Sequence, residues 1–442
     1  MAVSGARQKT IAFVTLGSLG DLHPCLALGV ELKRRGHAIK IITTEFYRSR
    51  VERLGMGFCP MRPDWDPTAP ELIGQCEELK TGPEILFRRL ILPHLRDSYA
   101  DLLAAVDGAD LMVAGELAFA APLVAEKLGL RWASLILSPC SFFSTRDPSV
   151  LVNVPWMMAV RKAGHVPYRA LLNFARWGTQ HWWNPVRELR EQEHLTEECD
   201  PLVRDKFSPY RVLALFSSWL ATPQRDWPSQ TVQPGFVFYD GQTMAPQLSE
   251  TIRRFLESGN APIVFTLGST AVSHPGSFYA TSIEVARRLS ARAILIGATR
   301  EMEWITSSIL SLPYVPYSEV FPAAAVIVHQ GGSGTTAQAL RAGRPMLCVP
   351  WGWDQPDNGL RAERRGGALC IPKHRYSMDR AADALDRLQN DRSIARSAKA
   401  ASTHLRGEPG LAGAVASLEA LKQGEVSRRS DSLGGSSEWL QG

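Results

Sequence analysis

The chain has 442 residues, a formal net charge of +5 at pH 7 and a hydrophobic fraction of 45%. This length and composition predict two domains, each with a substantial core. Basic and acidic residues are interspersed, so the small positive excess does not predict nucleic-acid binding. No apolar run reaches the roughly 18 residues of a membrane-spanning helix, and the polar first residues lack the apolar core of a secretory signal.

Seven cysteines, without a C-x-x-C pair, favour reduced thiols over disulfides or a zinc site. Together with the absence of a signal pattern, they predict a cytoplasmic protein. The Asp64-Trp65-Asp66 sequence has the D-x-D spacing of a metal motif, but it lies among prolines and is interpreted as a loop. We therefore predict neither a metal ion nor a cofactor.

The first βαβ pattern begins with a buried strand over Thr10–Leu16. The loop GSLGDLHP, residues 17–24, leads into a helix that ends at Gly36, and Ala38–Thr43 is the next strand. The loop lacks the third glycine of a G-x-G-x-x-G motif, which argues against NAD binding. Asp21 in this loop either faces a ligand or caps the helix.

Two further strands are predicted at Asp110–Ala114 and Trp132–Leu137. Glu116 follows the first of them. Because parallel strands end at a common edge of the sheet, Glu116 either lies near Asp21 or belongs to the surface.

The segment 149–187 contains no Asp or Glu, but it has five Arg or Lys residues and four tryptophans. The tryptophans are Trp156, Trp177, Trp182 and Trp183. Aromatic residues among basic ones suggest an apolar ligand pocket or a patch at a membrane surface. Helices that pack on the core with their arginines outward are the alternative.

A turn-rich stretch over residues 226–245 is predicted to be a linker. A second βαβ series begins after it with the strand Pro262–Leu267, which ends at Gly268-Ser269-Thr270. We therefore predict domains over 1–225 and 246–410. The tail, 411–442, has an end rich in Ser and Gly that is expected to be disordered.

The most specific pattern lies in residues 314–358. The apolar string Ala323–Val328 predicts a buried strand that ends at His329. The glycine-rich turn 330–336 follows and leads into a helix over Ala337–Ala342, and Met346–Val349 is the next strand. The exposed N–H groups at the start of such a helix form a site for a phosphate, to which His329 could also donate a hydrogen bond.

Asp354 and Gln355 follow the last of these strands and should reach the same edge of the sheet. A carboxylate beside a carboxamide suits the binding of adjacent sugar hydroxyls.

The order aromatic-x-Pro, His-x-Gly, Gly-Thr-Thr and Asp-Gln resembles the donor-binding signature of family 1 (UGT-like) glycosyltransferases of the GT-B fold. The resemblance covers about residues 10–410 and implies an α/β protein with two Rossmann-like domains whose parallel sheets face a central cleft. The phrases GSLGDLHP, WLATPQRDWP, PGFVFYDG and FTLGS are similar to bacterial rhamnosyltransferase-like members and to those that act on sterols and natural products.

The resemblance also implies a donor site. Tyr314 would stack on the nucleotide base, and Val315 would contact the base through its backbone. Asp354 and Gln355 would hold the sugar hydroxyls. The residues implied at the diphosphate are Ser269, His329, Gly331, Gly332, Ser333, Gly334 and Thr335. Two departures from the family pattern, Tyr317 for Gln and Ala337 for the ribose-binding Glu of plant members, leave ribose recognition open.

In the first domain, the resemblance implies that Asp21 is the general base that deprotonates the acceptor hydroxyl, with His23 as the rival base. Glu116 would tune Asp21. Ser18, Leu19, Trp182 and Trp183 are assigned to the acceptor site.

The implied reaction is a single inverting displacement. It would move a hexosyl group from UDP-glucose or a dTDP-rhamnose-like donor to a hydroxyl of a lipophilic small molecule or lipid. The protein could contact the inner face of a membrane peripherally. Two other functions stay open, a sugar-nucleotide epimerase of the GT-B fold and a non-catalytic sugar-nucleotide-binding helper protein. The sequence does not predict the oligomeric state.

Overall fold

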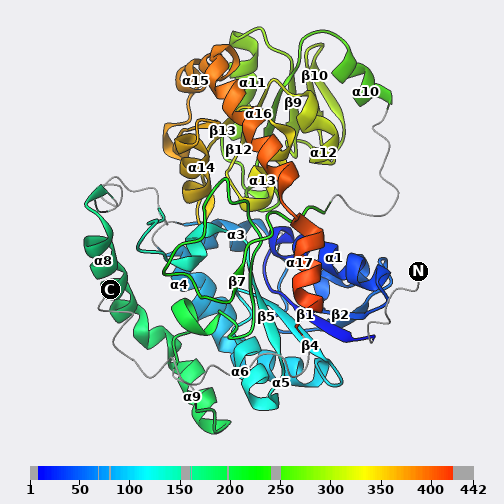
Figure 1. The fold of residues 1–442 in the computed structure, drawn as a ribbon. Coiled ribbons are helices and arrows are strands. Elements are labelled where there is room, and N and C mark those ends of the chain that lie inside the picture. Colours follow the sequence, from blue (N-terminus) through cyan, green and yellow to red (C-terminus); the bar gives the residue numbers. More distant parts are fainter. Residues whose placement is uncertain are drawn as a thin grey trace.

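The computed structural model describes residues 8–67, 69–78, 81–150, 160, 162–196, 199–239 and 250–421. Within these ranges the chain forms two lobes, each built on a seven-stranded sheet with helices around it (Figure 1). The first lobe is blue to green and the second is green to orange. The predicted α/β fold with two Rossmann-like domains is confirmed.

The first sheet has the strand order β3-β2-β1-β4-β5-β6-β7, and all of its neighbouring strands are parallel. Its strands are β1 Thr10–Val14, β2 Ala38–Thr43, β3 Gly57–Pro60, β4 Leu111–Gly115, β5 Trp132–Ile136, β6 Val212–Ala214 and β7 Thr231–Val232. The helices of this lobe are α1 Leu19–Arg34, α2 Arg48–Glu52, α3 Pro70–Cys76, α4 Gly82–Glu84, α5 Leu95–Ala105, α6 Ala120–Leu128, α8 His165–Thr179 and α9 Asn184–Gln192.

Strand β1 shows why this sheet has a core on each face. Ile11 and Phe13 pack into one apolar cluster, whereas Ala12 and Val14 pack into another. Successive side chains of a strand point to opposite faces, so a strand buried on both sides is apolar throughout. This is why the continuous apolar run at the start of the chain was recognisable as a strand.

The second sheet has the order β10-β11-β9-β8-β12-β13-β14, with β10 and β11 antiparallel and the other pairs parallel. Its strands are β8 Ile263–Thr266, β9 Ala293–Ile296, β10 Glu303–Thr306, β11 Ile309–Leu312, β12 Val326–His329, β13 Met346–Cys348 and β14 Ala368–Cys370. The helices that follow the linker are α10 Glu250–Glu257, α11 Phe278–Arg288, α12 Tyr317–Val320, α13 Ser333–Ala342, α14 Gln355–Arg364, α15 Met378–Asn390, α16 Arg392–Gly407 and α17 Gly410–Glu419.

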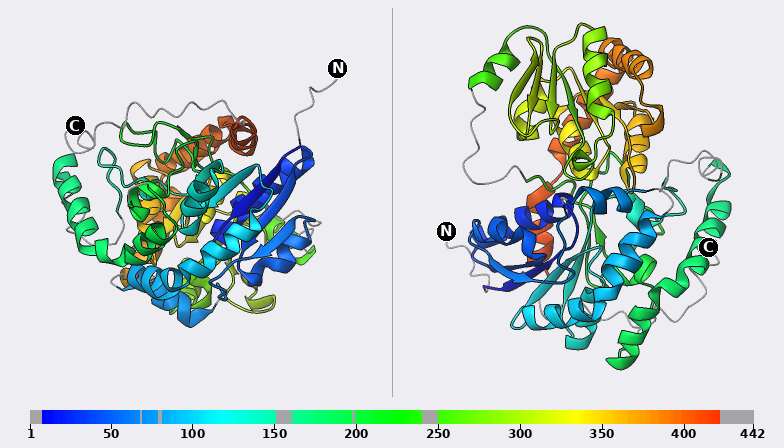
Figure 2. Two further views of the ribbon diagram at one scale, coloured as in Figure 1. Left: turned by 90° about the horizontal axis from the view of Figure 1, so that it is seen from below. Right: turned by 180° about the vertical axis from the view of Figure 1, so that it is seen from behind.

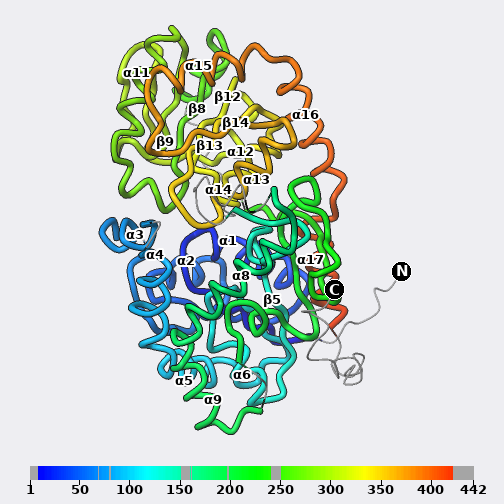
Figure 3. Tube along the Cα trace, turned by 90° about the vertical axis from the view of Figure 1, so that its left-hand side faces the viewer, coloured from blue at the N-terminus to red at the C-terminus, as the bar shows by residue number. Residues whose placement is uncertain are grey.

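An apolar cluster joins the two lobes. It contains Ile136 and Phe216 from the first lobe together with Val264 and Ile327 from the second. All four side chains are fully buried. Figure 3 shows α13 and α14 of the second lobe at this boundary, directly above the first lobe. Burial of shared apolar surface therefore holds the lobes together.

The end of the described chain returns to the first lobe. Helix α17 lies beside α1 (Figure 1), and its residues Ala414, Val415 and Leu418 are buried in the cluster that contains Leu22. Residues 411–419 of the predicted tail are thus helical and packed, because their apolar side chains recur at helical spacing. The Ser- and Gly-rich end of the tail lies outside the described residues. Within the predicted linker, β7 adds an edge strand to the first sheet.

Candidate active site

The carboxyl edges of the two sheets face each other. Ser333, which follows β12, donates a hydrogen bond from Oγ to the carbonyl oxygen of Leu137, which follows β5, at 2.6 Å. Ser138 Oγ lies 3.0 Å from Oδ1 of Asn358 in α14. Ligands of open α/β sheets bind beyond the carboxyl ends of the strands. Most of the predicted site residues therefore meet at the interface between the lobes.

The turn between β12 and α13 is shaped by two glycines. Gly331 has a φ of 93°, and a Cβ atom there would lie 2.8 Å from the carbonyl oxygen of Gln355. Gly332 is the N-cap of α13 and provides no capping side chain. The amides of Ser333, Gly334 and Thr335 thus begin the helix without side-chain partners at the cap, which is an arrangement that suits an anion.

The structure places His329 differently from the prediction. Its side chain is fully buried, its Nδ1 accepts a hydrogen bond from the Gly331 amide at 3.0 Å, and its Nε2 lies 3.4 Å from Met346 Sδ. The ring has no exposed surface, because Met346 and Cys348 of the neighbouring strand β13 lie against its Nε2. We correct the expectation of a direct phosphate donor: His329 holds the Gly331 turn.

Gln330 is a residue that the sequence reading missed. Gln330 is 4% exposed, and its side-chain amide packs directly against both Gly268 and Gly332. A Cβ atom on either glycine would therefore collide with this amide. It therefore joins the glycine-rich turn to the turn that carries Ser269, which is half-buried. A polar residue between a buried strand and two glycines is the signal that could have revealed it.

Tyr314 lies on the loop between β11 and α12, and 70% of its surface is exposed. An ordinary core role for Tyr314 is therefore ruled out, and its ring is free to stack on a planar group. Val315 beside it is buried in the shared core. Tyr317 stacks on Phe321 with 4.4 Å between ring centroids, so it supports this loop from within.

Asp354 and Gln355 do not have equivalent positions. Asp354 is half-buried at the cleft, and its Oδ2 accepts a hydrogen bond from Asn358 at 2.7 Å. Gln355 is 4% exposed, and its Oε1 accepts hydrogen bonds from the amides of Trp351 (2.8 Å) and Gly352 (3.3 Å). The Gln355 oxygen is thus used to hold the Trp351-Gly352 turn, and a sugar contact of its amide nitrogen stays a prediction.

Of the two roles that the sequence left open for Asp21, the structure shows the helix cap, and a role toward a ligand stays a prediction. Its Oδ2 accepts hydrogen bonds from Ser18 N (2.8 Å) and Ser18 Oγ (3.1 Å), which completes a capping box at the start of α1. Leu19, the first residue of α1, is half-buried beside it. Burial raises the pKa of Asp21 to about 6, the Ser18 hydrogen bonds oppose this rise, and the charge of Glu116 adds to it.

The carboxyls of the two lobes interact across the interface. Burial raises the pKa of Asp354 to about 7, and the charges of Asp21 and Glu116 raise it further against the hydrogen bond from Asn358. Strand β4 lies beside β1 with Ala114 opposite Val14, so Glu116 lies at the same edge of the sheet as the loop that carries Asp21. A carboxylate whose pKa lies close to neutrality is well suited to proton transfer.

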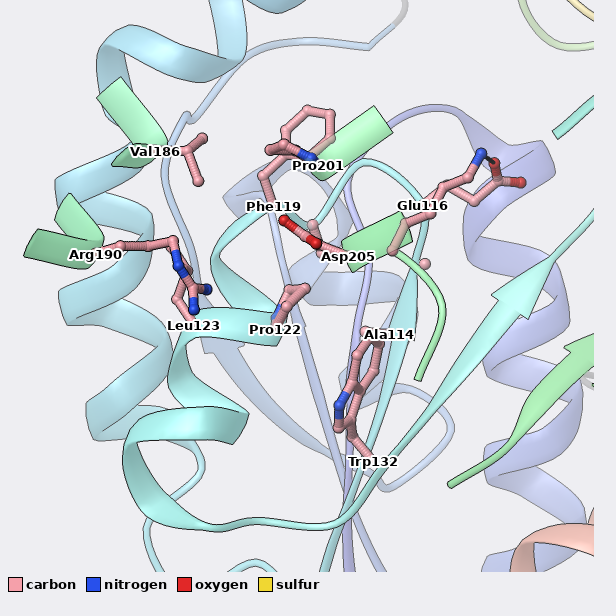
Figure 4. Close-up of a pocket in the computed structure, with 13 residues that line it drawn as sticks. Ala114, Glu116, Phe119, Pro122, Leu123, Trp132, Val186, Arg190, Pro201 and Asp205 are labelled. Carbon is pink, nitrogen blue, oxygen red and sulfur yellow. Dashed lines mark hydrogen bonds and ion pairs between the residues drawn. The ribbon is translucent and has the colours of Figure 1, made fainter. Parts of the chain in front are cut away.

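Glu116 also borders a small cavity in the first lobe, which Figure 4 shows together with Asp205, Arg190 and Trp132. The buried Lys206 donates to the Ser141 carbonyl oxygen at 2.5 Å and lies 3.5 Å from Glu116 Oε2. The cavity volume of about 10 Å³ is that of one water molecule, so this cavity cannot be an acceptor pocket. The buried Lys206, which also lines the cavity, is the cation that lies beside Glu116.

His23, the rival base, points elsewhere. Its ring packs against Tyr239 with 5.0 Å between centroids, and burial lowers its pKa to about 4. Asp64 of the D-x-D sequence accepts a hydrogen bond from the Glu45 amide at 3.0 Å and so belongs to its loop. Among the described residues, no group of three His, Cys, Asp or Glu side chains is arranged to hold a metal ion.

The predicted tryptophan pair does not line an open pocket. Trp183 is 5% exposed and packs against Phe87 and Phe119, with ring centroids 5.7 and 5.3 Å apart. Trp182 is partly buried against the same cluster, and Trp156 lies outside the described residues. This corrects the acceptor assignment of Trp183. Phe87 instead reaches Trp353 of the second lobe at 6.4 Å, so these two rings border the interface.

Helix α14 carries a buried ionic network that the sequence reading also missed. Arg361 Nε lies 2.6 Å from Asp357 Oδ2, and the same guanidinium pairs with Asp147 of the first lobe. Asp357 Oδ1 accepts a hydrogen bond from the Val150 amide at 2.9 Å, and Arg361 also reaches Ser149 Oγ at 3.0 Å. Asp357 and Arg361 are one helical turn apart, but their partner loop could not be inferred from that spacing.

Two family models match the chain. Residues 11–134 match the glycosyltransferase family 28 N-terminal domain, and residues 289–421 match the C-terminal domain of erythromycin biosynthesis protein CIII-like proteins. The first model runs from β1 into β5, and the second covers the second lobe from β9 to β14 together with α17.

Two relatives are similar along most of the chain. An O-mycaminosyltylonolide 6-deoxyallosyltransferase of Streptomyces fradiae is 30% identical over 426 residues, which is 92% of this chain and 96% of that enzyme. A sterol 3-beta-glucosyltransferase of Arabidopsis thaliana is 26% identical over 425 residues, which is 92% of this chain and 64% of that enzyme.

Solved glycosyltransferase structures share the fold. The glycotransferase of kitacinnamycin superposes with a TM-score of 0.71 at 20% identity, over 94% of this chain and 99% of that one. The spinosyn rhamnosyltransferase SpnG, complexed with thymidine diphosphate, has a TM-score of 0.67 at 15% identity, over 93% of this chain and all of that one. The glycosyltransferase family model and the 30% identical relative favour a sugar-transferring enzyme over an epimerase or a helper protein. The chain belongs to the UGT-like glycosyltransferases of the GT-B fold.

Proposed function

We propose that this glycosyltransferase moves a hexosyl group from a nucleoside-diphosphate sugar to a hydroxyl of a lipophilic acceptor, with inversion at the sugar carbon. The observation that carries the proposal is that Asp21 lies at the start of α1 on the first lobe, while Asn358 links Asp354 to the turn before the uncapped start of α13 on the second. The relatives named for O-mycaminosyltylonolide and for sterols support a lipophilic acceptor.

The acceptor hydroxyl loses its proton to Asp21 as its oxygen attacks the sugar carbon. The bond between that carbon and the diphosphate oxygen breaks, and the electron pair leaves with the diphosphate. Amides of Ser333, Gly334 and Thr335 at the start of α13 stabilise the departing charge. Because attack and departure occur on opposite sides of the carbon, a single displacement inverts its configuration.

We assign the donor contacts to residues whose side chains are exposed or half-buried at the proposed site. Tyr314 stacks on the nucleotide base, beside the Val315 backbone, and Asp354 accepts hydrogen bonds from the sugar hydroxyls. Ser269 lies at the turn next to Gln330 and contacts the diphosphate. The donor is UDP-glucose or a dTDP-hexose, and no metal ion takes part in this proposal.

The test is release of nucleoside diphosphate from UDP-glucose and from dTDP-rhamnose, each with a panel of macrolide aglycones, sterols, phenols and hydroxy-fatty acyl compounds. Release that depends on the acceptor and prefers one donor supports the proposal. Conversion of the sugar without any acceptor would identify an epimerase. Tight donor binding without release under any acceptor would identify a helper protein.

We also propose that the enzyme is cytoplasmic and that it contacts a membrane surface through α8. The helix lies on the outside of the first lobe (Figure 2), and Val166, Phe174 and Trp177 are 54%, 68% and 66% exposed. The segment 149–187 has no acidic residue that would repel anionic lipid. No helix of the described ranges is long and apolar enough to cross a membrane.

Flotation with vesicles of phosphatidylglycerol and phosphatidylcholine tests this contact. The wild type should float with the anionic vesicles, and the Phe174→Ser/Trp177→Ser variant should not. Equal flotation of both proteins would refute a role for α8. Self-association that these substitutions abolish would show that a second copy covers the helix instead.

A further inference from the structure

Asn358 joins three parts of the site. Its Nδ2 donates hydrogen bonds to Asp354 Oδ2 at 2.7 Å and to the Gly331 carbonyl oxygen at 3.1 Å. Its Oδ1 accepts a hydrogen bond from Ser138 Oγ of the first lobe at 3.0 Å. Only 1% of the residue is exposed. Both N–H groups and the carbonyl oxygen of the amide are therefore engaged in the interior.

The partners determine the orientation of this amide. The Gly331 carbonyl oxygen and the Asp354 carboxylate accept, so the NH₂ group must face them. On the other side, the hydroxyl of Ser138 can donate to Oδ1, while Cys140 Sγ lies 3.5 Å from the same hydroxyl oxygen. Reversing the amide would place an oxygen against two acceptors, which is costly in the interior.

We propose that Asn358 is a positioning residue for the donor sugar. Asn358 holds Asp354 toward the cleft only when Ser138 of the docked first lobe fixes the Asn358 amide. The inference rests on the proposed role of Asp354. Asn358 uses Oδ2 of that carboxylate and leaves Oδ1 for a sugar hydroxyl. The sugar site is thus coupled to the contact between the lobes through one side chain.

The coupling has a physical consequence for the charge of Asp354. The hydrogen bond from Asn358 lowers the pKa of Asp354 against the effects of burial and of the neighbouring charges. Loss of this donor therefore leaves more of the carboxyl protonated near neutral pH. A protonated carboxyl accepts hydrogen bonds from sugar hydroxyls less well than a carboxylate.

The variants Asn358→Ala and Ser138→Ala test the proposal in the full-length protein. Asn390→Ala is a matched control, because Asn390 Nδ2 donates to Asp386 Oδ1 at 2.9 Å across the same four-residue spacing, on the surface of α15. Calorimetric titration with UDP-glucose and dTDP-rhamnose is compared with titration by UDP and dTDP, which lack the sugar.

We expect Asn358→Ala to weaken binding of the preferred sugar nucleotide about tenfold and that of its nucleoside diphosphate less than twofold. Ser138→Ala should weaken binding of the sugar nucleotide roughly threefold. The double variant should bind the sugar nucleotide no more weakly than Asn358→Ala does. Asn390→Ala should behave as wild type. In the pH profile of kcat/KM for the donor, the ascending limb should move to higher pH only in Asn358→Ala and Ser138→Ala.

Equal weakening of both ligands, additive effects of the two substitutions, or an unmoved pH limb would overturn the proposal. If Asn358→Ala does not fold, Ser138→Ala tests the proposal through the same comparison of sugar-nucleotide and nucleoside-diphosphate affinity and the same pH profile. Asp354→Ala separates this inference from the proposed function. Unchanged sugar-nucleotide affinity in Asp354→Ala would refute the role of Asp354 itself. Weakening in Asp354→Ala without weakening in Asn358→Ala would refute only the positioning role.

Discussion

Replacing Asp21 by Asn removes a charge and keeps the shape of the side chain. Burial raises the pKa of Asp21 from 3.8 to about 6. Such a shift corresponds to at most about 3 kcal/mol of folding free energy on full ionisation, and partial solvent exposure reduces this to about 1–2 kcal/mol. Because the folded-state pKa is raised, this penalty is absent below about pH 4 and complete only above the folded pKa of about 6.

The Asn variant should therefore be more stable than wild type at pH 8 and equally stable near pH 4. We expect the Tm at pH 8 to rise by roughly 2–8 °C, because each 1 kcal/mol shifts the Tm of a domain of this size by about 2–4 °C. Turnover should fall about 100-fold or more, and the rise of activity near pH 6 should disappear. Thermal unfolding at the two pH values and diphosphate release measure both effects.

Two results would refute this reasoning separately. A variant that retains more than a tenth of the wild-type turnover would show that Asp21 is not the base. A variant that is less stable than wild type at pH 8 would show that the capping hydrogen bonds to Ser18 need the negative charge more than burial opposes it.

Three further predictions concern the second lobe. Tyr314→Ala should raise the donor KM about tenfold without lowering the Tm, since the exposed ring contributes to stacking and not to the core. His329→Ala should weaken nucleotide binding and turnover together, because the Gly331 amide loses its acceptor; unchanged kinetics would contradict this. Arg361→Met should destabilise the protein by about 3–5 kcal/mol in denaturant unfolding, and adding Asp357→Asn should restore part of this loss, since Asp357 would otherwise be buried without its partner.

Much of the site's location could be read from local patterns. The apolar run before His329, the glycines after it and Asp354 after the next strand all indicated the carboxyl edge of a parallel sheet, and the structure shows them there. Such patterns are readable because strand burial and glycine turns depend on residues within a few positions of each other.

The direction in which individual side chains point could not be predicted from local sequence patterns. His329 occupies its predicted place in the chain, yet its ring turns inward against Met346. The oxygen of Gln355 is engaged by the Trp351 amide. Trp183 likewise packs behind Phe87. Whether a polar or aromatic side chain reaches a cleft depends on neighbours supplied by other strands and helices, which no local pattern specifies.

By itself, the sequence determined the class of fold, the order of its strands and turns, and the family whose donor signature it carries. Only the tertiary structure decided that Asp21, Glu116 and Asp354 influence one another across two lobes, and that Asn358 links the sugar site to Ser138. Periodicity and turn chemistry act over a few residues. In contrast, Ser138 and Asn358 are 220 positions apart and meet only because the two sheets pack edge to edge.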